Sequence, residues 1–210
     1  SIQLASGEVC YKLGVAFRQT LGTDAYPLLD ENSEPVIWNG NYQNPASTIS
    51  LNESNSFGTY FDFDVDEVTM TRTFTGGNWD VFCVPFDMTS TEIASQFGSG
   101  VEVKELTNVL SEGHNYTLVF STASSIEAGK PYMVRVPSNV SSISLTGKTI
   151  KGEVKATTID DLTFVGTYLY DEVPEGSFII KDGKSLRVNG SNSLKAFRGY
   201  ITADVSNIEI

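Results

Sequence analysis

Residues 177–188 read SFIIKDGKSLRV, and this stretch indicates the fold class. Apolar and β-branched residues lie on both sides of Asp182 and Gly183. An Asp-Gly pair suits the two-residue turn of the primed type, whose twist matches that of antiparallel strands. The segment therefore predicts a β-hairpin within a fold of antiparallel strands.

Residues 60–75 carry a second β signal. Apolar residues at positions 61, 63 and 65 alternate with aspartates, a period of two that is typical of a strand with one buried and one solvated face. Further strands are expected at residues 79–84, 101–106, 115–121, 131–136, 162–169 and 194–201. Because strands recur at intervals of roughly ten residues, we predict a mainly β fold, an antiparallel β-sandwich or sandwich-like barrel with one or two short helices.

Two short segments carry helix signals. In residues 89–98, TSTEIASQFG, Thr89 and Glu92 have the spacing of a capping box and a glycine supplies the stop. Residues 6–14, SGEVCYKLG, show a weaker version with a serine cap and a closing glycine. These segments are the two short helices that we expect.

Residues 27–56 differ from the rest of the chain in amino-acid composition. They contain three prolines and the polar run NPASTISLNESNS, which is typical of a boundary between structural units. We therefore predict a small N-terminal segment over residues 1–56, docked on an antiparallel β domain over residues 57–210.

The charge balance excludes some classes of partner. The chain has 26 acidic and 14 basic residues and a net charge of −12. Such a chain repels polyanions and lacks the cationic surface that phosphate binding needs, so we expect neither nucleic acid nor an anionic membrane as partner. No apolar run approaches the ~18 residues of a transmembrane helix, so we expect no membrane insertion in this segment.

No complete catalytic machinery is visible in the sequence. His114 is the only histidine, and its surroundings, EGHNYT, indicate a solvated loop. Nucleophile-elbow, Walker and dinucleotide motifs are absent from the sequence. Acid pairs such as Asp160 with Asp161 and Asp171 with Glu172 lie in turn-like segments, and nothing marks one pair as the two carboxylates of a glycoside hydrolase. We therefore expect a protein that is not an enzyme and has no cofactor, with a carboxylate-based hydrolase as the competing hypothesis.

The sequence also predicts no metal site. Asp62, Asp64 and Asp66 offer oxygen ligands of the kind that calcium prefers. Alternate side chains on a strand are about 6–7 Å apart, which is too far for all three to bind one ion directly. A solvated strand face is the favoured interpretation.

The sequence does not decide whether its two cysteines, Cys10 and Cys83, form a disulfide. Both lie among apolar neighbours, so two small buried side chains are the favoured interpretation.

Several separated stretches follow one another along most of the chain. They are LASGEVCYKLG with QTLGTDAYP near the start, then RTFTGGNWDVFCVPFDM, SIEAGKPYMVRV, LTFVGTY and LKAFRGYI. Together they resemble a β-rich module that recurs near the C-terminus of multidomain cell-surface and secreted proteins of Bacteroidetes, whose function is unassigned. The resemblance implies an extracellular or cell-surface location, often with leucine-rich or other repeats upstream, and it supplies no catalytic residues. The motifs themselves consist of residues typical of a core and its turns. Trp79, Val81 and Cys83, for example, suit a buried strand.

Residues 38–44, WNGNYQN, form the candidate binding site. Trp38 and Tyr42 flank an Asn-Gly turn among amide side chains, an arrangement suited to stacking on a sugar ring. The competing interpretation is that Trp38 packs the N-terminal segment onto the β domain. We expect a non-catalytic binding or interaction module of adhesion type, with a protein or glycan ligand at the cell surface. The alternatives are a structural spacer or cap beneath upstream repeats, or an accessory domain of a secreted hydrolase.

Overall fold

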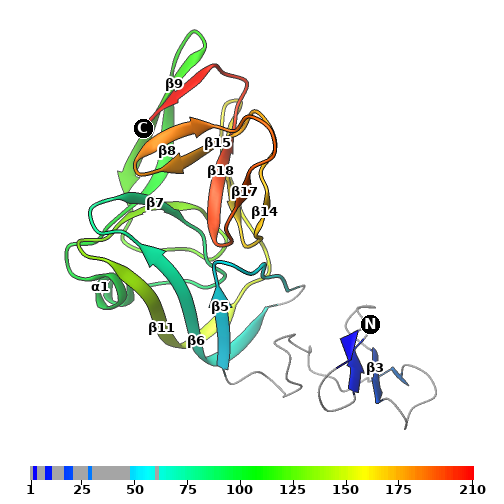
Figure 1. Ribbon diagram of the computed structural model, residues 1–210. Coiled ribbons are helices and arrows are strands. Elements are labelled where there is room, and N and C mark those ends of the chain that lie inside the picture. The colour runs from blue at the N-terminus through cyan, green and yellow to red at the C-terminus, as the bar shows by residue number, and fades with distance from the viewer. Residues whose placement is uncertain (1, 4–7, 11–16, 21–27, 30–47, 60–61) are drawn as a thin grey trace.

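The computed structural model describes the backbone of residues 2–3, 8–10, 17–20, 28–29, 48–59 and 62–210, and the side chains of residues 48–59 and 62–210 (Figure 1). Within these residues the chain is mainly β, with one α-helix. The predicted fold class is confirmed, because several sheets pack in a sandwich-like arrangement.

Near the N-terminus, four short strands form an antiparallel sheet in the order β1-β2-β3-β4. The strands are β1 (Ile2–Gln3), β2 (Glu8–Cys10), β3 (Phe17–Thr20) and β4 (Leu28–Leu29). The helix expected over residues 6–14 is therefore wrong at residues 8–10. Two apolar residues at helical spacing are a weak signal, and here pairing with a strand on each side overrides it.

Two five-stranded sheets pack against each other across a shared core. The first has the order β19-β9-β8-β10-β7, formed by β7 (Trp79–Phe82), β8 (Glu102–Glu112), β9 (Asn115–Thr122), β10 (Tyr132–Arg135) and β19 (Asn207–Glu209). The second has the order β12-β13-β18-β15-β16, formed by β12 (Ala156–Ile159), β13 (Leu162–Thr167), β15 (Phe178–Lys181), β16 (Lys184–Arg187) and β18 (Arg198–Thr202). Leu118 and Met133 of the first sheet meet Phe164 and Ile201 of the second in this core.

A second core lies beneath a three-stranded sheet of order β11-β6-β5. Its strands are β5 (Thr48–Asn52), β6 (Phe63–Phe74) and β11 (Val140–Ile150), and Figure 1 shows β6 and β11 as curved ribbons beside α1 (Ser90–Phe97). The remaining strands, β14 (Asp171–Glu172) and β17 (Ser193–Leu194), form a two-stranded sheet. β5 precedes the boundary expected at residue 56 and pairs in parallel with β6, so residues 48–52 share a sheet with the β domain.

Strands β7 and β10 form a wall between the two cores. Along β7, Val81 points into the core of the five-stranded sheets and Phe82 into the core beneath β6. Along β10, Met133 and Val134 divide in the same way. Because alternate residues of a strand point to opposite faces, a strand buried on both faces can serve two cores.

Two local predictions are confirmed. Thr89 caps α1, with its side chain accepting from the backbone of Glu92 while the Glu92 carboxylate accepts from the backbone of Thr89. The β15–β16 hairpin turns at Asp182 and Gly183, whose φ values of 52° and 70° are those of a primed turn.

Arg72 ties β6 to β7 and to the segment at Phe197. It points inward from β6, is 1% exposed, and donates hydrogen bonds to the backbone carbonyls of Val81 and Phe197. Its guanidinium lies 4.5 Å from the ring centroid of Phe74 and 5.1 Å from that of Phe82. Burial lowers the pKa of Arg72 to about 9, so the side chain keeps its charge at neutral pH.

Glu53, just after β5, forms ion pairs with Lys195 and Arg198 near the surface. Its carboxylate is 2.8 Å from Lys195 Nζ and 2.7 Å from Arg198 Nη2, and its carbonyl accepts from the backbone of Ala196. Burial alone raises the pKa of Glu53, but the hydrogen bond from Lys195 and the charge of Arg198 outweigh burial and hold this pKa below 4.5.

Glu53→Gln is expected to make the protein less sensitive to acid. A carboxyl group whose folded pKa is lowered stabilises the fold above its unfolded pKa, and this contribution is lost as pH falls through the folded pKa. The variant should therefore lose about 1–3 kcal/mol of unfolding free energy at pH 7, the range for hydrogen bonds to charged groups. Urea denaturation at pH 7, 5 and 3 measures the difference, which should shrink between pH 5 and pH 3. A difference that is the same at pH 7 and pH 3 would contradict the role of this carboxylate.

Candidate functional site

The structure describes some of the sequence-predicted candidates and not others. Trp38 and Tyr42 lie outside the described residues. His114 is exposed in the turn between β8 and β9, where its carbonyl accepts from the backbone of Ser206. The solvated-loop interpretation of His114 is confirmed.

The acidic residues are engaged in local contacts at the surface. On the exposed face of β6, Asp64 accepts a 2.6 Å hydrogen bond from Thr149, and just before β6, Asp62 accepts one of 3.4 Å from the backbone of Gly152. Asp160 and Asp161 are exposed in the turn between β12 and β13. Within the described ranges, no group of three His, Cys, Asp or Glu side chains could hold a metal ion.

Cys83 is a free thiol at the wall between the two cores. It is fully buried, donates to the carbonyl of Gly129, and has a pKa that burial raises to about 12. A thiol in this state is neutral and does not act as a nucleophile. Its expected place as a small buried side chain is confirmed, whereas the side chain of Cys10 lies outside the described residues.

Two strongly exposed apolar residues are adjacent in the chain. The described chain has six large apolar side chains that are strongly exposed: Leu110, Val154, Leu169, Tyr170, Leu186 and Ile210. Only Leu169 and Tyr170, at 46% and 47% exposure, are consecutive. Single exposed apolar residues are ordinary, whereas adjacent ones mark a candidate contact surface.

The backbone around Leu169 and Tyr170 is held on both sides. Ser56 Oγ accepts from the Tyr170 amide at 2.9 Å and donates to the Tyr170 carbonyl at 3.3 Å. The Leu169 amide donates to Thr167 Oγ1 at 3.0 Å, and the amide of Phe57 donates to the Tyr168 carbonyl at 2.9 Å. The two exposed side chains therefore project from a fixed backbone, which lowers the entropy cost of binding.

Tyr168 anchors this segment to the core. Its ring is 2% exposed, and its hydroxyl donates to the carbonyls of Val84 at 3.1 Å and Glu153 at 3.3 Å. Burial raises the pKa of Tyr168, so the hydroxyl stays protonated and remains a donor. Buried Tyr168 and exposed Tyr170 thus have different roles in one short stretch.

Polar side chains follow the exposed pair directly. Asp171 and Glu172 form β14 and are both exposed, and the Glu172 carboxylate accepts a hydrogen bond from Ser191. In the loop before β17, Asn192 Nδ2 donates to the carbonyl of Asn189. An aromatic ring beside carboxylate, hydroxyl and amide groups can contact a sugar ring or an apolar side chain of a protein and hydrogen-bond its polar groups.

The scaffold motif LTFVGTY ends at Tyr168, and no site was expected at Leu169 and Tyr170, although the sequence carries one signal there. In β13, buried residues occupy even positions as far as Tyr168. Leu169, in the bend after β13, places a large apolar residue at an odd position, and unlike the half-buried Val165 it is strongly exposed. A break of alternation at a strand end can therefore mark an exposed contact residue.

Comparison with known proteins leaves the family open. No protein-family model, no curated protein and no solved structure matches the chain. The resemblance to the Bacteroidetes module stays a prediction. In the part of the chain that the structure describes, no helix has the length and apolar character needed to cross a membrane.

Proposed function

We propose that this chain is a non-catalytic binding or interaction module of a cell-surface or secreted protein, whose protein or glycan ligand contacts Leu169 and Tyr170. The observation that carries the proposal is the pair of consecutive, strongly exposed apolar side chains on a backbone fixed by Ser56. A spacer has no need of such a pair, since scattered apolar residues suffice for a soluble surface. The extracellular location rests on the sequence resemblance alone.

Tyr170→Ala is expected to weaken binding about 10- to 30-fold, the effect of losing an aromatic anchor worth roughly 1.5–2 kcal/mol. Leu169→Ala should weaken it by a smaller factor, because leucine offers less contact area. A glycan array and a protein-binding screen of the chain would identify the ligand, and titration calorimetry would give the affinities. Tyr170→Phe should retain most of the affinity, because it keeps the ring.

Leu110→Ala is the matched control. Leu110 is 52% exposed on β8 and stands alone, so its removal should leave binding unchanged. Binding that survives both changes at residues 169 and 170 but is lost in Trp38→Ala or Tyr42→Ala would move the site to the pair expected from the sequence. No binding in the screen would favour a structural spacer.

A further inference from the structure

Asn189 and Gly190 form an Asn-Gly pair in the exposed loop between β16 and β17. Gly190 has no side chain, so nothing on its Cα shields its backbone nitrogen from the side chain of Asn189. Every other asparagine in the described part of the chain precedes a residue that has a side chain. Asn189 is therefore the described asparagine whose side-chain carbon is least shielded from the next backbone nitrogen.

Hydrogen bonds leave the two groups of this pair free. Among the described residues, the Asn189 side-chain amide has no hydrogen-bond partner and the Gly190 amide has no acceptor. Asn189 is contacted only at its backbone carbonyl, which accepts from Asn192 Nδ2 at 3.3 Å. Gly190 has a φ of 77°, and nothing lies within 4 Å of a Cβ added to it, so the space beside it is open.

Other asparagine side chains are held. The Asn139 side chain accepts a 2.9 Å hydrogen bond from the amide of Gly76, and that of Asn52 accepts one of 2.9 Å from the amide of Ser54. Asn192, three residues after Asn189, donates through its own side-chain nitrogen. A side chain fixed in this way is less free to meet the following backbone nitrogen.

The loop lies between two paired stretches of one long ribbon, since the register of β14 with β17 continues that of β15 with β16. On one side of the loop, the amide of Val173 donates to the carbonyl of Asn192 at 3.0 Å. On the other side, the amide of Val188 donates to the carbonyl of Ser177 at 2.7 Å. Residues 189–191 are thus held at both ends, while no backbone-to-backbone hydrogen bond of the described chain involves them.

We propose that Asn189 deamidates spontaneously in the folded protein. The backbone nitrogen of Gly190 loses its proton and attacks Cγ of Asn189. The new N–Cγ bond closes a five-membered succinimide ring, and the Cγ–Nδ2 bond breaks to release ammonia. One water molecule then opens the ring at either carbonyl, which leaves an aspartate or an isoaspartate at position 189. The site includes neither Leu169 nor Tyr170 and does not depend on the proposed function.

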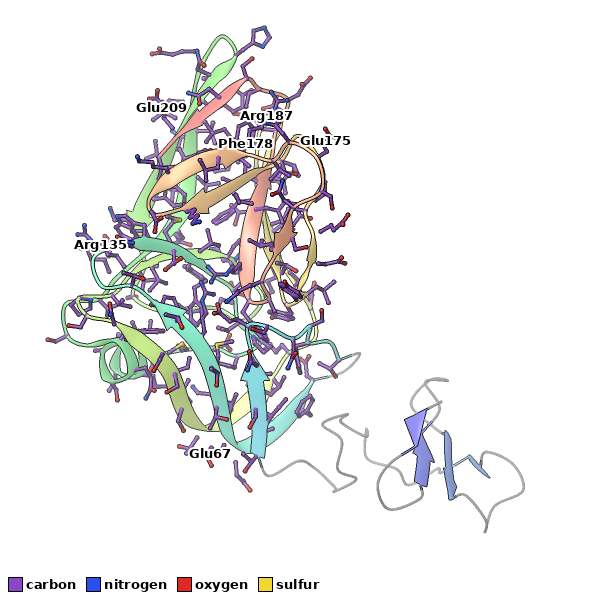
Figure 2. The ribbon with its side chains drawn as sticks, in the orientation of Figure 1. Glu67, Arg135, Glu175, Phe178, Arg187 and Glu209 are labelled. Carbon is purple, nitrogen blue, oxygen red and sulfur yellow. The ribbon has the colours of Figure 1, made fainter. Side chains whose placement is uncertain are left out.

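Conversion changes the ribbon in two ways. Both products add a carboxylate to a loop whose Ser191 already donates to the carboxylate of Glu172. In isoaspartate the main chain runs through Cβ and Cγ, so the backbone gains one atom between the two held ends of the loop. Figure 2 labels Glu175 and Arg187 on the two strands of this ribbon, next to the loop. We therefore expect the hydrogen bond from Val173 to the second strand to weaken.

Incubation of the folded protein at pH 8.5 and 37 °C, followed by trypsin digestion and mass spectrometry, tests the proposal. Trypsin releases residues 188–195, VNGSNSLK, which contain both Asn189 and Asn192. Asn192 is thus a control within the same peptide. Conversion should be at least about 10-fold faster at Asn189, which corresponds to about 1.4 kcal/mol of activation free energy. Circular dichroism checks that the protein stays folded, and a sample digested at time zero measures conversion during digestion.

Asn189→Gln is the matched variant. It should show no conversion at position 189, because glutamine would have to close a less favourable six-membered ring. Its melting temperature should equal that of the wild type, since the Asn189 side chain makes no hydrogen bond to the described residues. After incubation, hydrogen exchange at the Val173 amide should be faster in the converted wild type than in this variant.

Three results would count against these expectations. A synthetic VNGSNSLK peptide that converts while the folded protein does not would show that the fold blocks the reaction, and would overturn the proposal. Equal rates at Asn189 and Asn192 would overturn it as well, because glycine and the free amide would then give no selectivity. Unchanged exchange at Val173 after conversion would overturn the predicted loosening of the ribbon.

Discussion

Arg72→Ala is expected to lower the unfolding free energy by about 3–5 kcal/mol, the range for large-to-small changes in a core and for breaking a buried charged network. The change removes both donors to the carbonyls of Val81 and Phe197 and the packing of the guanidinium on Phe74 and Phe82. It therefore weakens the attachment of β6 to β7 and to the segment at Phe197. Urea denaturation followed by circular dichroism measures the loss.

Arg72→Met separates packing from hydrogen bonding. Methionine fills much of the same volume but donates no hydrogen bond, and apolar replacements of buried charged groups are often tolerated. We expect it to lose less than half of what the alanine variant loses. An alanine variant within about 1 kcal/mol of the wild type would show that Arg72 does not hold β6 to β7 and to the segment at Phe197.

The sequence predicted elements whose signals are local. The β15–β16 turn depends on Asp182 and Gly183 alone, and the start of α1 depends on Thr89 and Glu92 alone. In β6, apolar and acidic residues alternate without reference to any partner. Each feature follows from the conformational preferences of a few neighbouring residues.

β11 escaped prediction although it is one of the longest strands. Its sequence, VSSISLTGKTI, contains few large apolar residues, and Gly147 has a left-handed φ of 61°. Ile143 and Leu145 reach the core, while the intervening serines and threonines are exposed. The strand forms because it pairs with β6 over nearly its whole length. Such pairing leaves no run of apolar residues in the sequence of the strand.

Sequence patterns also did not predict two parallel strand pairs. β5 pairs in parallel with β6, and β19, near the C-terminus, pairs in parallel with β9, where Asn207 lies opposite Asn115. Pairing between distant strands depends on the three-dimensional fold, whereas a hairpin depends on its turn. The expectation of antiparallel strands holds for the other strand pairs among the described residues.

The exposure of a side chain at the surface depends on what the fold leaves uncovered. Tyr168 and Tyr170 are two residues apart, yet one is buried and the other is exposed. Trp79, the first residue of β7, is partly exposed, whereas Val81 and Phe82 of the same strand are buried. Residue type favours burial for all three side chains, so only the packed structure distinguishes core from contact surface.

Gly129→Ala is expected to destabilise the protein by about 3 kcal/mol or more and to lower its melting temperature by at least about 6–12 °C. Gly129 has a left-handed φ of 81°, and an added Cβ would lie 2.3 Å from the carbonyl oxygen of Glu153. The site cannot easily relax, because the Gly129 amide donates to Val84 and its carbonyl accepts from Lys155. Thermal and urea denaturation would measure the loss.

Gly77→Ala is the control that isolates the contact from the backbone conformation. Gly77 has nearly the same φ, 83°, but nothing lies within 4 Å of an added Cβ. It should therefore lose only the ~1–2 kcal/mol that a side chain costs in the left-handed region. The two variants share the cost of placing a side chain in the left-handed region. The difference between their losses of unfolding free energy therefore measures the clash with Glu153. Equal losses would mean that the segment around Glu153 moves away freely and that Gly129 is required only for its turn.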